Sequence, residues 1–185
     1  MLNKKLFSTV AQKTLAFFCL RPDQRFHGRE VARQMGEQPS SVQMAIKTLA
    51  KEGVLTAERR GKMIFYALDE SNPLVRPYKV LAVVALLEPL VRKLRKTVDL
   101  IVLYGSSAHG TFRSDSDIDL LIVTSHEDEV RDMVSSFSGR FAKEIRPVIH
   151  SLAEWMDVEE KDRVFAEEVG KGFVLFQSEH YESSI

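Results

Sequence analysis

The sequence YGSSAHGTFRSDSDIDL, residues 104–120, decides the fold of the second half of this 185-residue chain. An apolar run from Leu100 to Leu103 leads into it and predicts a strand that ends at Gly105. The missing side chain of Gly105 permits a close approach of the backbone. The residues that follow predict a short helix or turn, whose first N–H groups and the Ser106 hydroxyl are suited to binding a phosphate.

An acidic pair, Asp117 and Asp119, stands near the start of a second expected strand, residues 116–124. Side chains alternate along a strand, so both carboxylates lie on one face. Two like charges this close repel unless a cation lies between them or one is protonated. Mg²⁺ takes one or two protein carboxylates together with substrate oxygens, so the pair predicts a Mg²⁺ site beside the phosphate site.

A purely structural alternative is that Asp115 and Asp117 cap a turn before an ordinary strand. It explains neither Gly105-Ser106 nor an acidic pair inside an apolar run. The spacing, Gly105-Ser106, ten residues, and then Asp117-x-Asp119, resembles the signature of the nucleotidyltransferase superfamily with the DNA polymerase β-like fold. The minimal nucleotidyltransferases are the members most similar to it, and the resemblance covers about residues 98–180.

The resemblance implies an activity and a set of site residues. The activity is transfer of a nucleoside monophosphate, most often AMP from ATP, to an acceptor, with release of pyrophosphate. Gly105 and Ser106 would hold the triphosphate, and Asp117 and Asp119 would be the catalytic, Mg²⁺-binding pair. Some minimal members are antitoxins that adenylylate a partner toxin and others act on small molecules, so the acceptor stays open.

The chain departs from the family pattern at two places. His109 stands where the family often has arginine, and Arg113 is the basic residue predicted to contact the nucleotide in its place. A third carboxylate is expected on a later strand, residues 144–150, whose one acid is Glu144. Glu144 is therefore predicted as the third catalytic residue, and a surface glutamate is the alternative.

The first 70 residues have a different organisation. Apolar periodicity predicts helices over residues 5–20, 28–35 and 39–52, followed by strands over 54–58 and 63–68. Between the strands lies the basic sequence Arg59-Arg60-Gly61-Lys62. Three short helices and a hairpin with a basic tip resemble a winged helix-turn-helix domain. A module for dimerisation or partner docking is the alternative to DNA binding.

This second resemblance implies a transcription regulator whose third helix enters the DNA major groove while the hairpin contacts the backbone. The implied base-reading residues are Ser40, Ser41, Gln43, Met44 and Lys47. The implied backbone contacts are Arg59, Arg60 and Lys62. Winged-helix regulators often pair to read two half-sites, so a homodimer is expected.

We therefore predict an α+β protein with a winged helix-turn-helix domain at residues 1–70, a linker helix at 71–97 and a nucleotidyltransferase domain at 98–185. The linker's apolar residues exceed one helical face, which favours packing against both modules or a second chain, with a simple connector as the alternative. Further helices are expected over 128–141, 152–156 and 161–169, and a strand over 172–176. The tail, 177–185, is polar and expected to fray.

The amino-acid composition excludes several classes of protein. Apolar residues make up 44% and charged residues 28%, which excludes a disordered chain, and no apolar run is long enough for a membrane span. The one cysteine, Cys19, excludes an intrachain disulfide and favours a cytoplasmic location. Residues 1–70 hold 12 Lys and Arg against 7 Asp and Glu, and the rest holds 14 against 19, so the basic front suits DNA.

Three functions stay open at this point. The first is a Mg²⁺-dependent nucleotidyltransferase joined to a DNA-binding domain. The second is a DNA-binding regulator that senses nucleotide and has lost turnover. The third is an antitoxin-like protein that modifies or masks a partner toxin.

Overall fold

The computed structural model describes residues 7–138 and 143–182. The chain divides into two compact units, Met1–Ala85 and Leu86–Ile185. Helix α5, Val75–Leu94, crosses this division and continues through Pro89. None of the helices within the described residues combines the length and the apolar character that crossing a bilayer requires.

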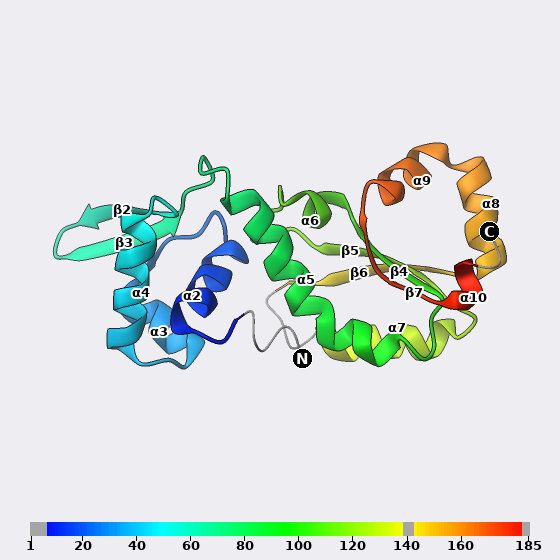
Figure 1. Ribbon diagram of the computed structural model, residues 1–185, viewed down its shortest axis with the longest axis horizontal. Coiled ribbons are helices and arrows are strands. Elements are labelled where there is room, and N and C mark those ends of the chain that lie inside the picture. Colours follow the sequence, from blue (N-terminus) through cyan, green and yellow to red (C-terminus); the bar gives the residue numbers. More distant parts are fainter. Residues whose placement is uncertain (1–6, 139–142, 183–185) are drawn as a thin grey trace. The chain divides into compact units, whose positions relative to one another are not determined.

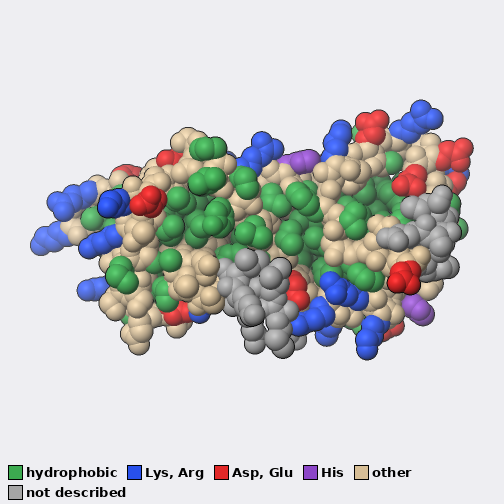
Figure 2. All heavy atoms as spheres, in the orientation of Figure 1, with side chains coloured by type: hydrophobic (Ala, Val, Ile, Leu, Met, Phe, Trp, Pro, Cys, Tyr) green, Lys and Arg blue, Asp and Glu red, His purple; other side chains and the backbone are tan. Residues whose placement is uncertain are grey.

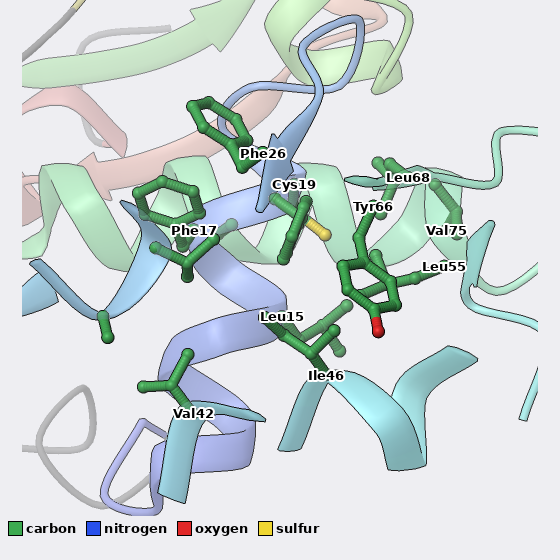
Figure 3. Packing of buried hydrophobic residues seen from close by; sticks show 14 residues of the cluster. Leu15, Phe17, Cys19, Phe26, Val42, Ile46, Leu55, Tyr66, Leu68 and Val75 are labelled. Carbon is green, nitrogen blue, oxygen red and sulfur yellow. The ribbon is translucent and has the colours of Figure 1, made fainter. Parts of the chain in front are cut away.

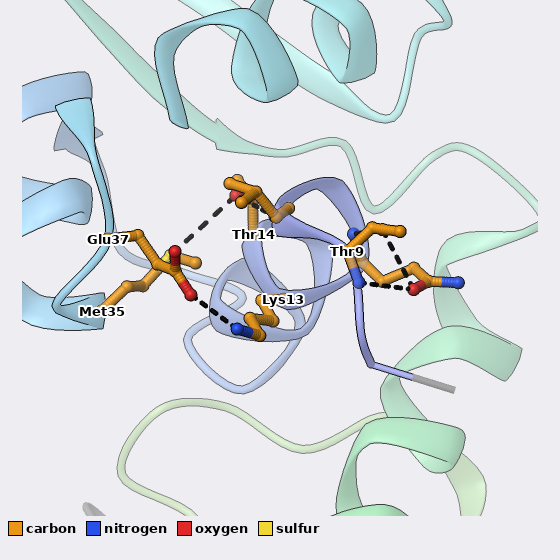
Figure 4. Close-up of polar contacts among 7 residues, drawn as sticks. Thr9, Lys13, Thr14, Met35 and Glu37 are labelled. Carbon is orange, nitrogen blue, oxygen red and sulfur yellow. Dashed lines mark hydrogen bonds and ion pairs between the residues drawn. The ribbon is translucent and has the colours of Figure 1, made fainter. Parts of the chain in front are cut away.

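From residue 7 onward, the described part of the first unit contains the helices α2 (Val10–Cys19), α3 (Gly28–Met35) and α4 (Pro39–Lys51), in that order (Figure 1). Helix α2 begins at Val10 and not at residue 5, because Thr9 and Gln12 form a capping box that fixes the helix start. Residues 5 and 6 of the predicted helix lie outside the described residues. Lys13 of α2 contacts Glu37 at 2.6 Å, which ties α2 to the chain between α3 and α4 (Figure 4).

Strands β2 (Leu55–Arg60) and β3 (Met63–Leu68) form the predicted hairpin. Strand β2 is longer than expected, so Arg59 and Arg60 lie on the strand and the turn consists of Gly61 and Lys62 alone. Gly61 has φ 60°, a conformation that glycine adopts without strain. A short strand, β1 (Phe26–His27), pairs with the other edge of β3 and was not predicted.

The core of the first unit brings together all of these elements (Figure 3). Phe17 and Phe26 pack edge to face with ring centroids 4.9 Å apart. Val42 and Ile46 come from α4, and Leu55, Tyr66 and Leu68 come from the hairpin. Since α4 is fixed by its buried face, its opposite face is presented to solvent in a defined orientation.

The second unit is built on a four-stranded sheet in the order β6-β5-β4-β7. Its strands are β4 (Leu100–Tyr104), β5 (Ile118–Val123), β6 (Ile145–His150) and β7 (Phe173–Gln177). β5 is parallel to β6, while β4 is antiparallel to both β5 and β7. Five of the six β5 residues are wholly buried, so this central strand is fixed on both faces.

Within the described residues, the second unit also contains the helices α6 (Gly105–His109), α7 (Glu127–Ser138), α8 (Leu152–Lys161), α9 (Arg163–Gly170) and α10 (Glu179–Glu182). Residues 139–141 of the predicted 128–141 helix lie outside the described residues. Helix α8 runs five residues beyond its predicted end. The prediction of a frayed tail was wrong at α10, where Tyr181 is buried and its hydroxyl accepts a hydrogen bond from Trp155 Nε1 at 3.1 Å.

Candidate functional site

Gly105 lies where β4 ends and α6 begins, and its backbone has φ 66°. A Cβ at this position would lie 2.7 Å from Asp119 Oδ2, closer than atoms approach without displacement. Asp119 faces Tyr104 in the antiparallel register, which explains the proximity. Glycine is thus required both for the turn and to leave room for the carboxylate.

Asp117 precedes β5, and Asp119 is the second residue of β5. The backbone carbonyl of Asp117 accepts a hydrogen bond from the buried Ser107 hydroxyl at 3.3 Å. This contact ties α6 to the start of β5. The structure therefore brings Gly105 and both aspartates of the sequence motif together.

The electrostatics of the pair follow from its surroundings. Partial burial raises the pKa of Asp119, and the negative charge of Asp117 raises it further. Burial, with the charge of Asp119, also raises the pKa of Tyr104 to about 12, so its hydroxyl stays protonated at neutral pH. The free protein holds excess negative charge here, which favours binding of a cation.

The positive charge of Arg146 offsets part of this negative charge. Arg146 and Asp119 are partners in the parallel register of β5 and β6. The Arg146 guanidinium Nε lies 2.9 Å from Asp117 Oδ2. Its charge also opposes the rise of the Asp119 pKa. Sequence reasoning put Arg146 on this strand but did not predict that it would bind the acidic pair.

The predicted third carboxylate, Glu144, lies just before β6, and its side chain is exposed. Its backbone carbonyl accepts a hydrogen bond from the Ile118 N–H at 2.9 Å. A different acid, Glu168 of α9, is close enough for its charge to raise the pKa of both Asp119 and Tyr104. Helix α9 is held there by Phe165, whose ring packs edge to face on Tyr104 at 5.5 Å.

Lys143 is a further residue of the site that the sequence did not reveal. It is buried, and its ammonium donates to the carbonyls of Arg113 (2.6 Å) and Ser116 (2.9 Å). It also lies 4.7 Å from the centroid of the Phe112 ring. These contacts fix the segment that leads into Asp117. A lone lysine beside a strand carries no sequence signal for such a role.

The predicted nucleotide-binding residues Ser106 and Arg113 flank this segment. Ser106 is half-buried in α6, and its carbonyl accepts the N–H groups of Gly110 and Thr111. Arg113 is exposed in the loop between α6 and β5. Both lie on the stretch that joins Gly105 to Asp117.

A divalent cation has a partial donor set here. Asp117 and Asp119 are hard oxygen donors on one face of the chain, and Mg²⁺ commonly takes two carboxylates with substrate oxygens completing its coordination. Among residues 7–138 and 143–182, no three His, Cys, Asp or Glu side chains are grouped as ligands. The two aspartates therefore fit a Mg²⁺ that a bound triphosphate helps to hold.

The proposed DNA-reading face is the solvent side of α4. Ser40, Met44 and Lys47 are exposed there, and Ser41 is half-buried. Gln43 differs, because its amide Nε2 donates to the Tyr66 hydroxyl at 3.4 Å and its Oε1 lies close to Gly28. Gln43 nevertheless lines one hollow of the α4 surface together with Ser40, Met44 and Lys47, so the structure brings these four predicted readers together, and Ser41 is not among the residues that line it.

Lys and Arg side chains gather over the hairpin of the first unit (Figure 2). The predicted contacts Arg59, Arg60 and Lys62 are all exposed. The positive charge of Arg60 is partly offset, because its guanidinium forms an ion pair with Glu58 at 2.8 Å. Arg25 also contacts Glu58, so one carboxylate is shared by two arginines.

Residues 85–171 match the family model of the nucleotidyltransferase domain. The C-terminal half of the chain is therefore a nucleotidyltransferase domain, as the Gly-Ser and Asp-x-Asp motif predicted. With the three helices and hairpin of the first unit, the chain joins a winged-helix domain to a nucleotidyltransferase domain, and the predicted α+β fold is confirmed.

Similar solved structures include a possible transcriptional regulator from Methanosarcina mazei Go1, with 16% identity, TM-score 0.35, and coverage of 50% of this chain and 82% of that one. The adhesin competence repressor AdcR of Streptococcus pyogenes has 22% identity, TM-score 0.38, and coverage of 51% and 69%. A mutant of the toxin-antitoxin MntA-HpeT has 17% identity, TM-score 0.39, and coverage of 53% and 76%. None of the curated proteins is a significant match.

Proposed function

We propose that this protein transfers a nucleoside monophosphate, AMP foremost, from a nucleoside triphosphate to a protein or small-molecule acceptor, and binds DNA through its winged-helix domain. In the transfer the acceptor oxygen bonds to the α-phosphorus, the bond from that phosphorus to the β-phosphate oxygen breaks, and pyrophosphate leaves. A cytoplasmic location and a homodimer that reads two half-sites belong to the same proposal.

The observation that carries the proposal is the approach of Gly105 to Asp119. The turn at Gly105 has a positive φ, and a Cβ built there would lie 2.7 Å from Asp119 Oδ2, so the carboxylate lies directly against the turn. This supports the proposal, because a triphosphate bound at the turn would lie beside a cation held by the aspartates.

The side chains have distinct roles in this proposal. Gly105 and Ser106 bind the triphosphate, Arg113 adds positive charge, and Asp117 and Asp119 hold Mg²⁺. When bound, Mg²⁺ neutralises phosphate charge during the displacement. The acceptor hydroxyl must lose a proton, and the two candidate bases are the predicted Glu144, just before β6, and Glu168, whose charge acts on Asp119. Replacing each by Gln tells which one turnover requires.

Nucleotide binding is the first test, because it needs no knowledge of the acceptor. We would titrate ATP, GTP, CTP and UTP with Mg²⁺ into the wild type and into Asp117→Asn/Asp119→Asn by calorimetry. Asp132→Asn, an exposed acid on α7, is the matched control. We expect binding by the wild type and the control and its loss in the double variant. Absence of binding by the wild type for all four nucleotides would contradict the proposal.

The Arg146–Asp117 ion pair favours a second candidate function. A site in which an arginine already binds one carboxylate of the acidic pair is suited to binding a nucleotide without turning it over. The protein would then be a regulator whose DNA affinity depends on nucleotide. Nucleotide binding without pyrophosphate release in the presence of every tested acceptor, together with a nucleotide-dependent DNA affinity, would favour this candidate.

An antitoxin-like partner is the third possibility that the fold leaves open. Its distinguishing result is capture of a defined toxin by the purified chain, followed by modification of that toxin in the presence of ATP.

A further inference from the structure

Arg146 occupies a position that the pairing of β5 and β6 determines. The parallel register sets Arg146 beside Asp119, and its Nε binds Asp117 Oδ2 at 2.9 Å. One guanidinium therefore interacts with both acids of the pair. It does so from β6, which is one of the two edge strands of the sheet.

The side chain of this residue is a cation whose planar guanidinium binds carboxylate and phosphate groups alike. Two adjacent carboxylates need a cation between them, and Arg146 supplies one without a metal. A divalent cation that used Asp117 Oδ2 would meet a like charge within bonding distance of the same oxygen.

The solvent exposure of the Arg146 side chain determines how easily it can move away from Asp117. Its side chain is 67% exposed, whereas that of Asp117 is only 22% exposed. An exposed ion pair contributes little net free energy, so the guanidinium can return to water at small cost. The backbone of Asp117 is fixed, because its carbonyl accepts a hydrogen bond from Ser107 and the preceding carbonyl, of Ser116, accepts one from Lys143.

We propose that the Arg146 guanidinium competes with a divalent metal ion for the Asp117 carboxylate. When a triphosphate binds, the guanidinium moves from this carboxylate to the phosphate oxygens. The free protein then binds metal weakly, and metal binds well only after nucleotide has engaged the Arg146 guanidinium through its phosphate oxygens. Arg146 is a positioning and ordering residue of the site. The nucleotide half of this inference rests on the proposed function, while the metal half does not.

The metal half is tested on the full chain without nucleotide, with Mn²⁺ as the probe and free Mn²⁺ measured by electron paramagnetic resonance. We expect Arg146→Gln to bind Mn²⁺ about threefold more tightly than the wild type, because the exposed ion pair that competes with the metal is gone. Arg146→Lys keeps the charge and should stay near the wild type. The matched control is Arg131→Gln, an exposed arginine of α7 that also pairs with an acid.

Two results would overturn the competition. One is an Arg146→Gln affinity for Mn²⁺ that stays within twofold of the wild type or is weaker. The other is a gain that persists in Arg146→Gln/Asp117→Asn, because the bound Mn²⁺ would then lie elsewhere. A thermal melt of each variant excludes unfolding as the cause of a lost signal, and Arg146→Ala, which also removes the charge, decides the matter if Arg146→Gln fails to fold.

The nucleotide half is tested with ATP in excess EDTA. We expect the wild type to bind ATP more tightly than Arg146→Gln, by about fivefold, because the guanidinium contacts the triphosphate. Equal affinities would overturn this half alone. If no variant binds ATP under any condition, the proposed function fails, and the Mn²⁺ titration still decides whether Arg146 competes for Asp117.

Discussion

Two constraints meet at a single residue, Gly105: a φ of 66° and a Cβ that would lie 2.7 Å from Asp119 Oδ2. We predict that Gly105→Ala lowers stability by about 1–2 kcal/mol for the backbone conformation. It should also weaken nucleotide binding more than tenfold, because Asp119 must rotate away. Urea denaturation and calorimetry measure the two effects.

Gly36 supplies the control. Its φ is 65°, and nothing lies within 4 Å of a Cβ built there. Gly36→Ala should therefore show a similar loss of stability with unchanged nucleotide binding. Loss of binding in both variants, or in neither, would contradict the specific role of the Gly105–Asp119 contact.

The ionisation of Asp119 should make the free energy of unfolding depend on pH. Its folded-state pKa is raised, chiefly by burial and next by Asp117. The ionised carboxylate therefore destabilises the metal-free fold, and Asp119→Asn should raise Tm at pH 7 by about 1–4 °C. As pH falls through the raised pKa toward 3.8, Asp119 becomes neutral in the wild type and the two curves converge. A difference that grows as pH falls would contradict this sign.

Lys143 is expected to dominate the stability of the loop before Asp117. Lys143→Met leaves the carbonyls of Arg113 and Ser116 without their buried donor, at a cost of about 2–4 kcal/mol. Lys161→Met is the control, because Lys161 is exposed and pairs only with Asp157, one turn away. That variant should lose less than about 0.5 kcal/mol. Equal losses in urea denaturation would remove the special role of Lys143.

At the scale of elements, local patterns predicted most of the fold. Periodicity of apolar residues gave α3, α4 and the hairpin, and the continuous apolar runs gave β4 and β5. Strand β1 was missed, because two residues carry no periodicity and pair only through the distant β3. Helix α10 was missed for a similar reason: Tyr181 is ordered by Trp155, a contact 26 residues away.

The site divides in the same way. The sequence predicted Gly105, Asp117 and Asp119 as one group because they form a motif of fixed spacing, and the antiparallel pairing of β4 with β5 places Gly105 beside Asp119. The contributions of Arg146, Lys143 and Glu168 depend on strand register and helix packing, which the sequence does not display. The ion pair of Arg60 with Glu58 was also missed, because the predicted strand ended at residue 58 and the observed strand β2 continues to Arg60.

The hairpin carries a prediction of its own. Hydrogen bonds from Arg60 lower the pKa of Glu58, so Glu58 is ionised at neutral pH and holds both Arg60 and Arg25. Glu58→Gln should release these arginines and tighten binding to a random 20-bp duplex about threefold at 0.1 M KCl. The slope of log K against log salt should become steeper by up to about 0.9 for each newly contacted phosphate.

Fluorescence anisotropy across a KCl series measures both quantities. Glu127→Gln is the control, because Glu127 pairs with an exposed arginine in the other unit. Weaker DNA binding by Glu58→Gln would mean that the ion pairs hold the hairpin in its binding conformation.

On the scale of the whole molecule, two units with opposite net charge share one continuous helix, α5. If both functions operate and the shared helix couples them, the effect of nucleotide on DNA binding must equal that of DNA on nucleotide binding. We predict that saturating Mg²⁺-ATP changes DNA affinity by about fivefold or more at fixed salt, within the usual range of such couplings. DNA should then change ATP affinity by the same factor. Equal DNA affinities with and without ATP would make the units energetically independent.

Strand β5 also determines where this protein can acquire a new activity. Ile118, Leu120, Leu121, Ile122 and Val123 are fully buried, so substitution there disturbs packing before it alters chemistry. Arg146, Glu144 and Glu168 are exposed, and surface substitutions usually cost little stability. Adaptation would therefore proceed by exchanging side chains around an acidic pair that stays in place, and a directed-evolution library is best confined to these three positions.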